Sequence, residues 1–207
     1  MVKALLSPAD GERIRKAVAA VEARSSAELV VVVTPSSDGY ALYPLFWAAL
    51  VALLAGGLLA FVVPEWGARP IFAAEAVLFV AAALVLELPG LRRHLVPGHI
   101  KRAHASQLAR LHFAARVQDR TASRTGLLLF ASLAERHVEI IADTGIHARA
   151  GGESWPPIIA AFRAAVERGA LVDGFLVAIA GCGDLLEAHA PRAAADRNEL
   201  PDRPIEI

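Results

Sequence analysis

A long apolar segment constrains this 207-residue chain more than any other feature of its sequence. Residues 41–63 contain no charged residue, and residues 40–90 as a whole contain only four. At 1.5 Å per residue, a helix over 41–63 is about 34 Å long, which is enough to cross a hydrocarbon core about 30 Å thick. The segment therefore predicts a membrane span.

A second apolar run follows after a short break. Residues 64–70 contain two prolines, a glycine and Trp66, an aromatic residue of the kind found at membrane surfaces. The run resumes over residues 71–88, and Glu75 and Glu87 lie near its ends, where we expect them to meet the membrane surface. The two runs predict a transmembrane helical hairpin. The alternative is a hairpin buried in a soluble core.

Basic residues flank the hairpin on both sides, whereas the turn between its two spans holds only Arg69. By the positive-inside rule, both termini lie in the cytoplasm and the protein crosses the inner (cytoplasmic) membrane twice. We expect four basic residues after the hairpin to contact anionic lipid headgroups. These are Arg92, Arg93, Lys101 and Arg102. Residues 91–124 are basic overall, but only Phe113 offers an aromatic stacking surface, so a nucleic-acid partner is not expected.

Composition excludes several classes of protein. The mean hydropathy is +0.47, yet outside residues 40–90 charged residues are as frequent as in ordinary globular domains. This combination excludes a disordered chain and a fully soluble enzyme, and the single cysteine, Cys182, excludes a disulfide scaffold. One cysteine also agrees with a reducing compartment.

The hairpin interrupts a single soluble domain. Residues 1–39 supply its first helix and strand, residues 40–90 form the hairpin, and residues 91–207 supply the remainder. Ser7 and Pro8 are typical of a helix start, and the apolar spacing that follows predicts a helix over 8–24. The β-branched run Glu28–Thr34 predicts a strand buried on both faces, which needs partner strands from beyond the hairpin.

Those partner strands are predicted over 126–133 and 137–142, which are separated by a three-residue turn. Helices are predicted over 100–123 and 155–168, and residues 175–190 form either a helix or a strand followed by a helix. The predicted fold class is α/β, a small α/β/α sandwich with the two membrane spans inserted after its first strand.

Several stretches of the soluble region resemble the TPM domain family. The most specific runs from Arg124 to His147, with a glycine-led strand, an acid–arginine turn, a second strand and the loop Asp143-Thr144-Gly145. Residues 26–33, Trp155 with the helix it begins, and residues 198–202 resemble the family as well. The tail and the inserted hairpin resemble its bacterial membrane-bound branch in particular.

The resemblance implies an α/β/α sandwich around a mixed sheet. Family members from photosynthetic organisms are linked to photosystem repair and to acid phosphatase activity. Some members bind divalent cations, an animal member modulates a receptor channel, and most bacterial members have no assigned activity. The resemblance therefore narrows the fold more than the function.

The loop after the second predicted hairpin strand holds the best candidate site. Asp143, Glu153 and the later Asp173, with His147, offer oxygen and imidazole ligands for a divalent cation such as calcium or magnesium. A cation bound there could polarise a phosphate ester. The alternative is that Asp143 and Asp173 are turn or helix-capping residues ahead of Gly145 and Gly174.

Other polar residues give weaker signals. The sequence contains no nucleophile elbow, zinc-protease motif or P-loop. His137 and Glu139 alternate along one strand face, and we expect both to point to solvent. Ser132 and Cys182 have no basic partner nearby in the sequence, so neither is predicted to be a nucleophile.

Two functional hypotheses follow. The first is a membrane-anchored, cytoplasm-facing TPM domain protein that serves as an accessory or interaction module for other membrane proteins. The second is a divalent-metal-dependent, acid-phosphatase-like phosphomonoesterase acting on a phosphate ester through the Asp143 loop.

Overall fold

The fold is taken from a computed structural model that describes residues 5–92, 94–118, 120–121, 124–151, 154–192 and 199–207. The chain divides into two compact units. Residues 1–37 and 102–207 form the first, here called the sheet unit, and residues 38–101 form the second, here called the apolar unit. The boundary between residues 101 and 102 lies within the helix Gly98–Arg116.

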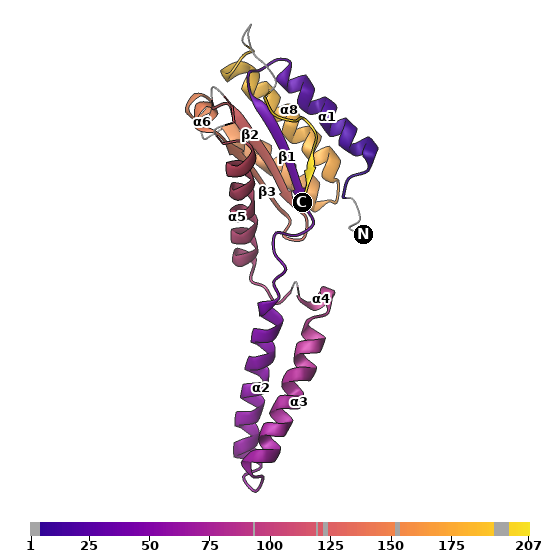
Figure 1. The fold of residues 1–207 in the computed structure, drawn as a ribbon, viewed down its shortest axis with the longest axis vertical. Helices are drawn as coiled ribbons and strands as arrows, with labels where there is room; N and C mark the ends of the chain where they lie inside the picture. Colours follow the sequence, from indigo (N-terminus) through magenta and orange to yellow (C-terminus); the bar gives the residue numbers. More distant parts are fainter. Residues whose placement is uncertain (1–4, 93, 119, 122–123, 152–153, 193–198) are drawn as a thin grey trace. The chain divides into compact units, whose positions relative to one another are not determined.

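The described chain contains eight helices and four strands (Figure 1). In order they are α1 (Pro8–Glu22), β1 (Glu28–Thr34), α2 (Leu42–Val62), α3 (Ala68–Leu86), α4 (Pro89–Arg92), α5 (Gly98–Arg116), β2 (Gly126–Ser132), β3 (His137–Ala142), α6 (Thr144–Ala150), α7 (Trp155–Glu167), α8 (Leu171–His189) and β4 (Ile205–Glu206). The α/β class predicted from the sequence is confirmed.

A four-stranded mixed sheet in the order β3-β2-β1-β4 forms the centre of the sheet unit. β1 pairs in parallel with β2, with Glu28 opposite Gly126 and Thr34 opposite Ser132, and β3 returns antiparallel to β2. The carboxyl ends of β1 and β2 therefore meet at one edge of the sheet, although 91 residues of sequence separate Thr34 from Gly126.

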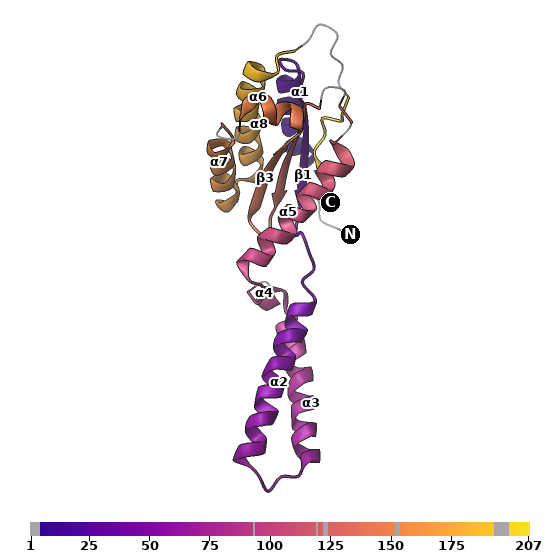
Figure 2. The same ribbon diagram turned by 90° about the vertical axis from the view of Figure 1, so that its left-hand side faces the viewer.

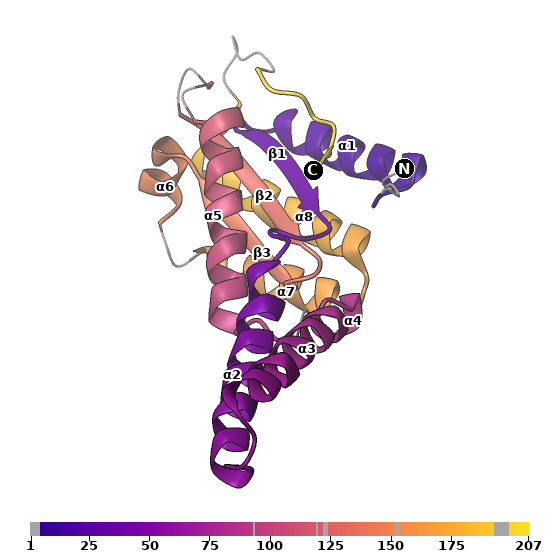
Figure 3. The same cartoon turned by 60° about the horizontal axis from the view of Figure 1, so that its bottom comes forward.

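Helices cover both faces of this sheet, as Figures 2 and 3 show. On one face, Val30, Val32 and Phe130 pack against Ala105 and Ala109 of α5. On the other face, alternate strand residues pack against α1, α7 and α8, whose largest buried side chains include Ile14, Phe162 and Phe175. Because both faces are covered, every residue of β1 and β2 is buried, which confirms the prediction made for Glu28–Thr34.

The carboxyl-terminal segment completes the sheet in a way that the sequence did not indicate. β4 is only two residues long, and it pairs in parallel with β1 through Val32 and Ile205. The backbone N–H groups of Leu5 and Leu6 donate to the Glu206 carboxylate at 2.8 and 3.3 Å. Leu5 and Leu6 are thereby tied to β4.

Local sequence signals account for most of the element boundaries. Ser7 caps α1 by accepting from the Asp10 N–H at 3.1 Å, and the predicted helix over 8–24 is confirmed with its end at Glu22. One prediction needs correction. The helix predicted over 100–123 spans Gly98–Arg116, because the chain must turn back after it to enter β2 beside β1. Of the two alternatives for residues 175–190, the structure has the helix, which is α8 and starts at Leu171.

The apolar unit contains α2 and α3 packed side by side (Figure 1). The buried residues of α2 recur at every fourth position, at Pro44, Ala48, Ala52 and Gly56, so small side chains let the two helices approach closely. The most apolar 18 residues of α2 have a mean hydropathy of 2.5, and 17% of them are buried. Those of α3 have a mean hydropathy of 2.0, and none is buried. Both helices are long and apolar enough to cross a membrane.

Candidate functional site

A hydrogen-bonded cluster lies at the sheet edge where β1 and β2 end. The buried Ser132 hydroxyl donates to Oε2 of Glu135, and the Ser37 hydroxyl donates to the Ser132 hydroxyl at 2.8 Å. The other carboxylate oxygen of Glu135 accepts from the Ser36 hydroxyl at 3.0 Å and from the Ser37 N–H at 3.1 Å. Glu135 therefore fixes the loop after β1 to the turn between β2 and β3.

Sequence reasoning missed this cluster because its two halves are almost a hundred residues apart. Ser36 and Ser37 follow the buried strand β1 closely, and that position in the sequence could have marked them as candidate site residues. Ligands of open α/β sheets bind beyond the carboxyl ends of parallel strands. A hollow of about 570 Å³ does lie there, and it is lined by Ser37, His104, Gln107, Leu108, Arg110 and Leu111.

Asp143, the principal predicted cation ligand, caps helix α6. Its Oδ1 accepts from the Thr144 N–H at 2.6 Å and from the Thr144 hydroxyl at 3.2 Å. The side chain is buried, and within the described residues its Oδ2 has no hydrogen-bond partner. The helix-capping alternative considered for Asp143 therefore has a geometric basis.

The two other predicted ligands that the structure describes do not form a site with Asp143. His147 is exposed on α6, and Asp173 is 67% exposed and forms an ion pair with Arg13 of α1 at 3.3 Å. Glu153 lies outside the described residues. In the part of the chain that the structure describes, no group of three or more His, Cys, Asp or Glu side chains could hold a metal ion.

Calcium and magnesium need several oxygen ligands. Of the predicted ligands that the structure describes, Asp143 alone offers a buried oxygen without a hydrogen-bond partner, and the described residues do not form a divalent-cation site by themselves. The cation site stays a prediction, and no step proposed below uses it.

His137 and Glu139 do not point to solvent, which corrects the expectation from their alternation. Their side chains are 16% and 22% exposed, and His137 Nε2 lies 3.0 Å from Glu139 Oε2. The Ser106 hydroxyl of α5 donates to the other oxygen of Glu139 at 3.1 Å. The expectation was wrong because α5 covers this face of the sheet.

Two acidic residues lie at the start of β1, where the tail of the chain attaches. Glu22 accepts from the Leu29 N–H at 2.9 Å, and Glu28 accepts from the N–H groups of Glu199 and Leu200 at 3.0 Å each. Burial raises the pKa of Glu22 to about 8, although the bond from Leu29 opposes the shift, and the charges of Glu28 and Asp202 raise it further. Glu22 therefore holds a proton at neutral pH.

Cys182 lies buried in α8 among the core residues of the sheet unit. Burial raises the pKa of its thiol to about 12. The thiolate is the reactive form of cysteine, so this residue is chemically inert at neutral pH.

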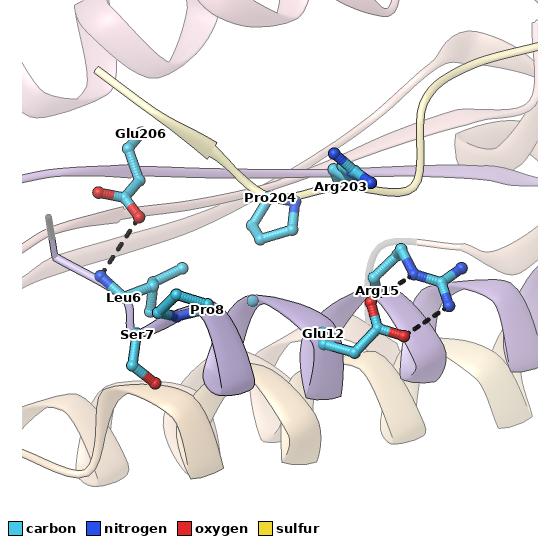
Figure 4. Close-up of a pocket in the computed structure, with 9 residues that line it drawn as sticks. Leu6, Ser7, Pro8, Glu12, Arg15, Arg203, Pro204 and Glu206 are labelled. Carbon is cyan, nitrogen blue, oxygen red and sulfur yellow. Dashed lines mark hydrogen bonds and ion pairs between the residues drawn. The ribbon is translucent and has the colours of Figure 1, made fainter.

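A second hollow, of about 460 Å³, lies between the start of α1 and the tail (Figure 4). Arg15 on its wall donates two hydrogen bonds of 2.8 Å to Glu12, which lowers the pKa of that carboxyl. Glu206 on the opposite wall accepts from the backbone of Leu6. These carboxylates are thus already engaged by groups of the chain itself.

The four residues predicted to meet the membrane surface differ in their surroundings. Arg92 forms an ion pair with Glu87 at 2.8 Å, and Arg102 is exposed on α5. Lys101 is partly buried, and Arg93 lies outside the described residues. The charge of Arg92 is therefore partly balanced within the apolar unit.

Comparisons with known proteins place the fold alone. The chain matches no model of a known protein family and no curated protein. Among solved structures, it is similar to the NMR structure of the BA42 protein from the psychrophilic bacterium Bizionia argentinensis. The TM-score is 0.63 at 14% sequence identity, and the match covers 100% of this chain and 99% of that one.

Proposed function

We propose that this protein is a membrane-anchored α/β protein whose sheet unit faces the cytoplasm and serves as an accessory module for other membrane proteins. The observation that carries the proposal is the exposed apolar surface of α2 and α3. Leu54 and Leu58 of α2 are 65% and 64% exposed, and α3 has no buried residue at all among those described.

Exposed apolar surface of this extent is unfavourable in water. Burying one leucine side chain is worth about 1.5–3 kcal/mol, and contiguous patches above a few hundred Å² mark interaction or membrane sites. α2 and α3 expose many large apolar side chains along their whole length. A bilayer covers such a surface without any further protein. It requires that backbone polar groups be hydrogen-bonded within the segment, and both helices meet this requirement.

The orientation and the compartment follow from the flanking charges. Basic residues lie before α2 and after α3, while the turn between these helices holds Arg69 alone. The positive-inside rule then favours the inner membrane, with both termini in the cytoplasm.

We also infer that the sheet unit is a TPM domain, and contacts made by the resembling stretches support this. Gly126, which begins the first strand of the most specific stretch, packs so tightly on Val117 that an added Cβ would lie 2.2 Å from its Cγ1. Asp143 of the same stretch caps α6. Glu28 of the first strand binds the backbone of the tail at Glu199 and Leu200. The first strand and the tail, two of the resembling stretches, are thus joined in one unit.

Alkaline carbonate extraction of bacterial membranes tests the anchor. We expect the full chain to stay in the membrane pellet and to enter solution only with detergent. A Leu54→Arg/Leu58→Arg variant should shift to the supernatant, since arginine at a helix centre costs about 2.5–3.5 kcal/mol on insertion scales. Leu111→Arg is the matched control, because Leu111 is 63% exposed on α5 and the substitution should leave the pellet fraction unchanged. Release of the unaltered chain by carbonate would refute the anchor.

Native electrophoresis after mild solubilisation tests the accessory role. A module bound to a membrane complex should migrate well above the 21.9 kDa of the single chain, and a second dimension should separate it from its partners. Repeated recovery as a lone monomer would count against the role and leave the anchor standing.

A further inference from the structure

An ionisable side chain lies against the partner helix inside the apolar unit. The Glu75 carboxylate of α3 faces Gly56 of α2 so closely that a Cβ added to Gly56 would lie 2.8 Å from Oε2. Glu75 is the eighth residue of α3, about 10 Å along the helix from its start. The sequence suggested a residue at the membrane surface, whereas the side chain packs onto α2.

A groove of about 430 Å³ opens beside this carboxylate. Apart from Glu75, its lining is apolar and comes from both helices. The lining residues are Ala49, Ala52 and Leu53 of α2 and Phe72, Ala76 and Phe79 of α3. Small residues, which allow close approach of helices, alternate in this lining with large apolar side chains that can pack on a helix, so the groove has the chemistry to receive one.

Among the described residues of its own unit, no counter-charge pairs with the carboxylate. Across the described residues, no hydrogen bond or ion pair to Glu75 is formed, and Arg69 lies six positions away on a different side of α3. Ionisable residues inside membranes are costly, and they usually pair with one another or face a bundle interior. A second copy of this chain would bring another acid to the groove, so charge complementarity favours a basic partner.

We propose that this groove binds a transmembrane helix of a partner protein, and that a lysine or arginine of that helix pairs with Glu75. The inference rests on the proposed membrane anchor and specifies the partner of the accessory role. The apolar walls supply van der Waals contact, and Glu75 sets the depth at which the basic residue must lie.

A synthetic transmembrane helix of leucine and alanine tests the proposal in phosphatidylcholine vesicles containing the full chain. One peptide carries a single lysine about 10 Å from the end that meets the α2–α3 turn, and the control peptide carries leucine there. A donor dye attached to Gly67→Cys, where an added side chain meets nothing within 4 Å, reports peptide binding by energy transfer. We expect the lysine peptide to bind roughly five- to thirtyfold more tightly than the leucine peptide.

Variants of the chain isolate the role of the carboxylate. Glu75→Gln should abolish the preference for the lysine peptide, and Glu75→Lys should transfer it to a peptide with glutamate at the same depth. Gly56→Ala should weaken it, because the new Cβ displaces the carboxylate. Gly57→Ala is the matched control, since a Cβ at Gly57 meets nothing within 4 Å, and it should change nothing.

The outcomes separate this inference from the anchor. Carbonate treatment of the same vesicles measures insertion independently, and failure to insert refutes both proposals. Insertion with equal binding of the lysine and leucine peptides refutes the groove proposal alone. Energy transfer between two labelled copies of the chain, at the expense of peptide binding, would overturn it in favour of self-association.

Discussion

Glu22 occupies a position that disfavours its own charge. It lies at the end of α1, is buried, and has the acidic Glu28 and Asp202 among its neighbours. The folded chain holds the Glu22 proton up to about pH 8, whereas the unfolded chain releases it near the ordinary pKa of 4.5. The folded state therefore loses stability relative to the unfolded state as the pH rises from about 4.5 to 8.

This linkage predicts a difference between two glutamine variants of α1. Between pH 5 and 8, Glu22 should lower the free energy of unfolding by on the order of 1 kcal/mol per pH unit, and Glu22→Gln should remove that slope. Glu12→Gln is the control, because Glu12 is exposed and its pKa is lowered by Arg15 instead of raised. Urea unfolding followed by Trp155 fluorescence, with Trp47 and Trp66 replaced by phenylalanine, measures both slopes. Parallel pH profiles for the unaltered chain and Glu22→Gln would contradict the assignment.

Substitution can separate the capping role of Asp143 from a role in metal binding. Because Asp143 caps α6, Asp143→Ala should lower the free energy of unfolding by about 0.5–2 kcal/mol, and Asp143→Asn should lower it less, since asparagine also caps helices. Asp173→Ala should cost under about 1 kcal/mol, since its ion pair with Arg13 is exposed. Urea unfolding with calcium, magnesium or chelator should give the same ranking. If Asp143→Asn lowered the free energy of unfolding only when a cation is present, the metal site would be supported instead.

At the scale of elements, helix α8 depends on small residues where it meets its neighbours. A Cβ added at Gly183 would lie 2.7 Å from Cγ2 of Val21 in α1, and one added at Gly174 would lie 3.1 Å from Cβ of Ala165 in α7. Val21 is buried and β-branched, so it has little rotamer freedom with which to move aside. Close packing of three helices on one face of the sheet thus requires glycine at these positions.

Two glycine-to-alanine substitutions should therefore change stability in opposite directions. Gly183→Ala should lower the free energy of unfolding by about 1–3 kcal/mol through overpacking against Val21. Gly11→Ala should raise it by up to about 1 kcal/mol, because a Cβ there meets only Pro204 at an ordinary 3.8 Å and alanine favours the helix. Thermal unfolding of both variants measures the contrast. An equal loss in both would mean that helix packing does not set the glycine requirement.

Elements were predicted from the sequence where a local pattern defines them. The β-branched run Glu28–Thr34 gave the bounds of β1, and Ser7 with Pro8 gave the start of α1. β4 escaped prediction because two residues carry no period, and it forms only through pairing with β1. The end of α5 was missed for a similar reason, since the return to β2 is a requirement of the sheet and not of the helix.

Candidate sites depended still more on contacts distant in the sequence. Asp143 was identified by its position after a strand, but the exposed position of Asp173 and its pairing with Arg13 are set by how α1 packs on α8. The cluster of Ser37, Ser132 and Glu135 joins two strand ends that only the parallel register brings together. Position in the sequence identified individual candidate residues, whereas their interaction partners could be identified only from the fold.

At the scale of the whole molecule, the sheet unit is assembled from two separate parts of the sequence. β1 belongs to residues 1–37, and its neighbours β2 and β4 belong to residues 102–207. The intervening residues 38–101 must leave and return on the same side of any membrane that they cross. An even number of spans satisfies this requirement, and α2 and α3 are two helices long and apolar enough to span a membrane.

This topology predicts which parts of the chain a membrane-impermeant maleimide can reach in intact cells. The native Cys182 is buried and its pKa is about 12, so the unaltered chain should stay unlabelled and needs no cysteine-free background. Gly67→Cys, in the turn between α2 and α3, should be labelled from outside. Leu111→Cys, exposed on α5 of the sheet unit, should be labelled only after the membrane is permeabilised. The opposite pattern would show the opposite orientation. Labelling of both cysteines without permeabilisation would show that no membrane separates them.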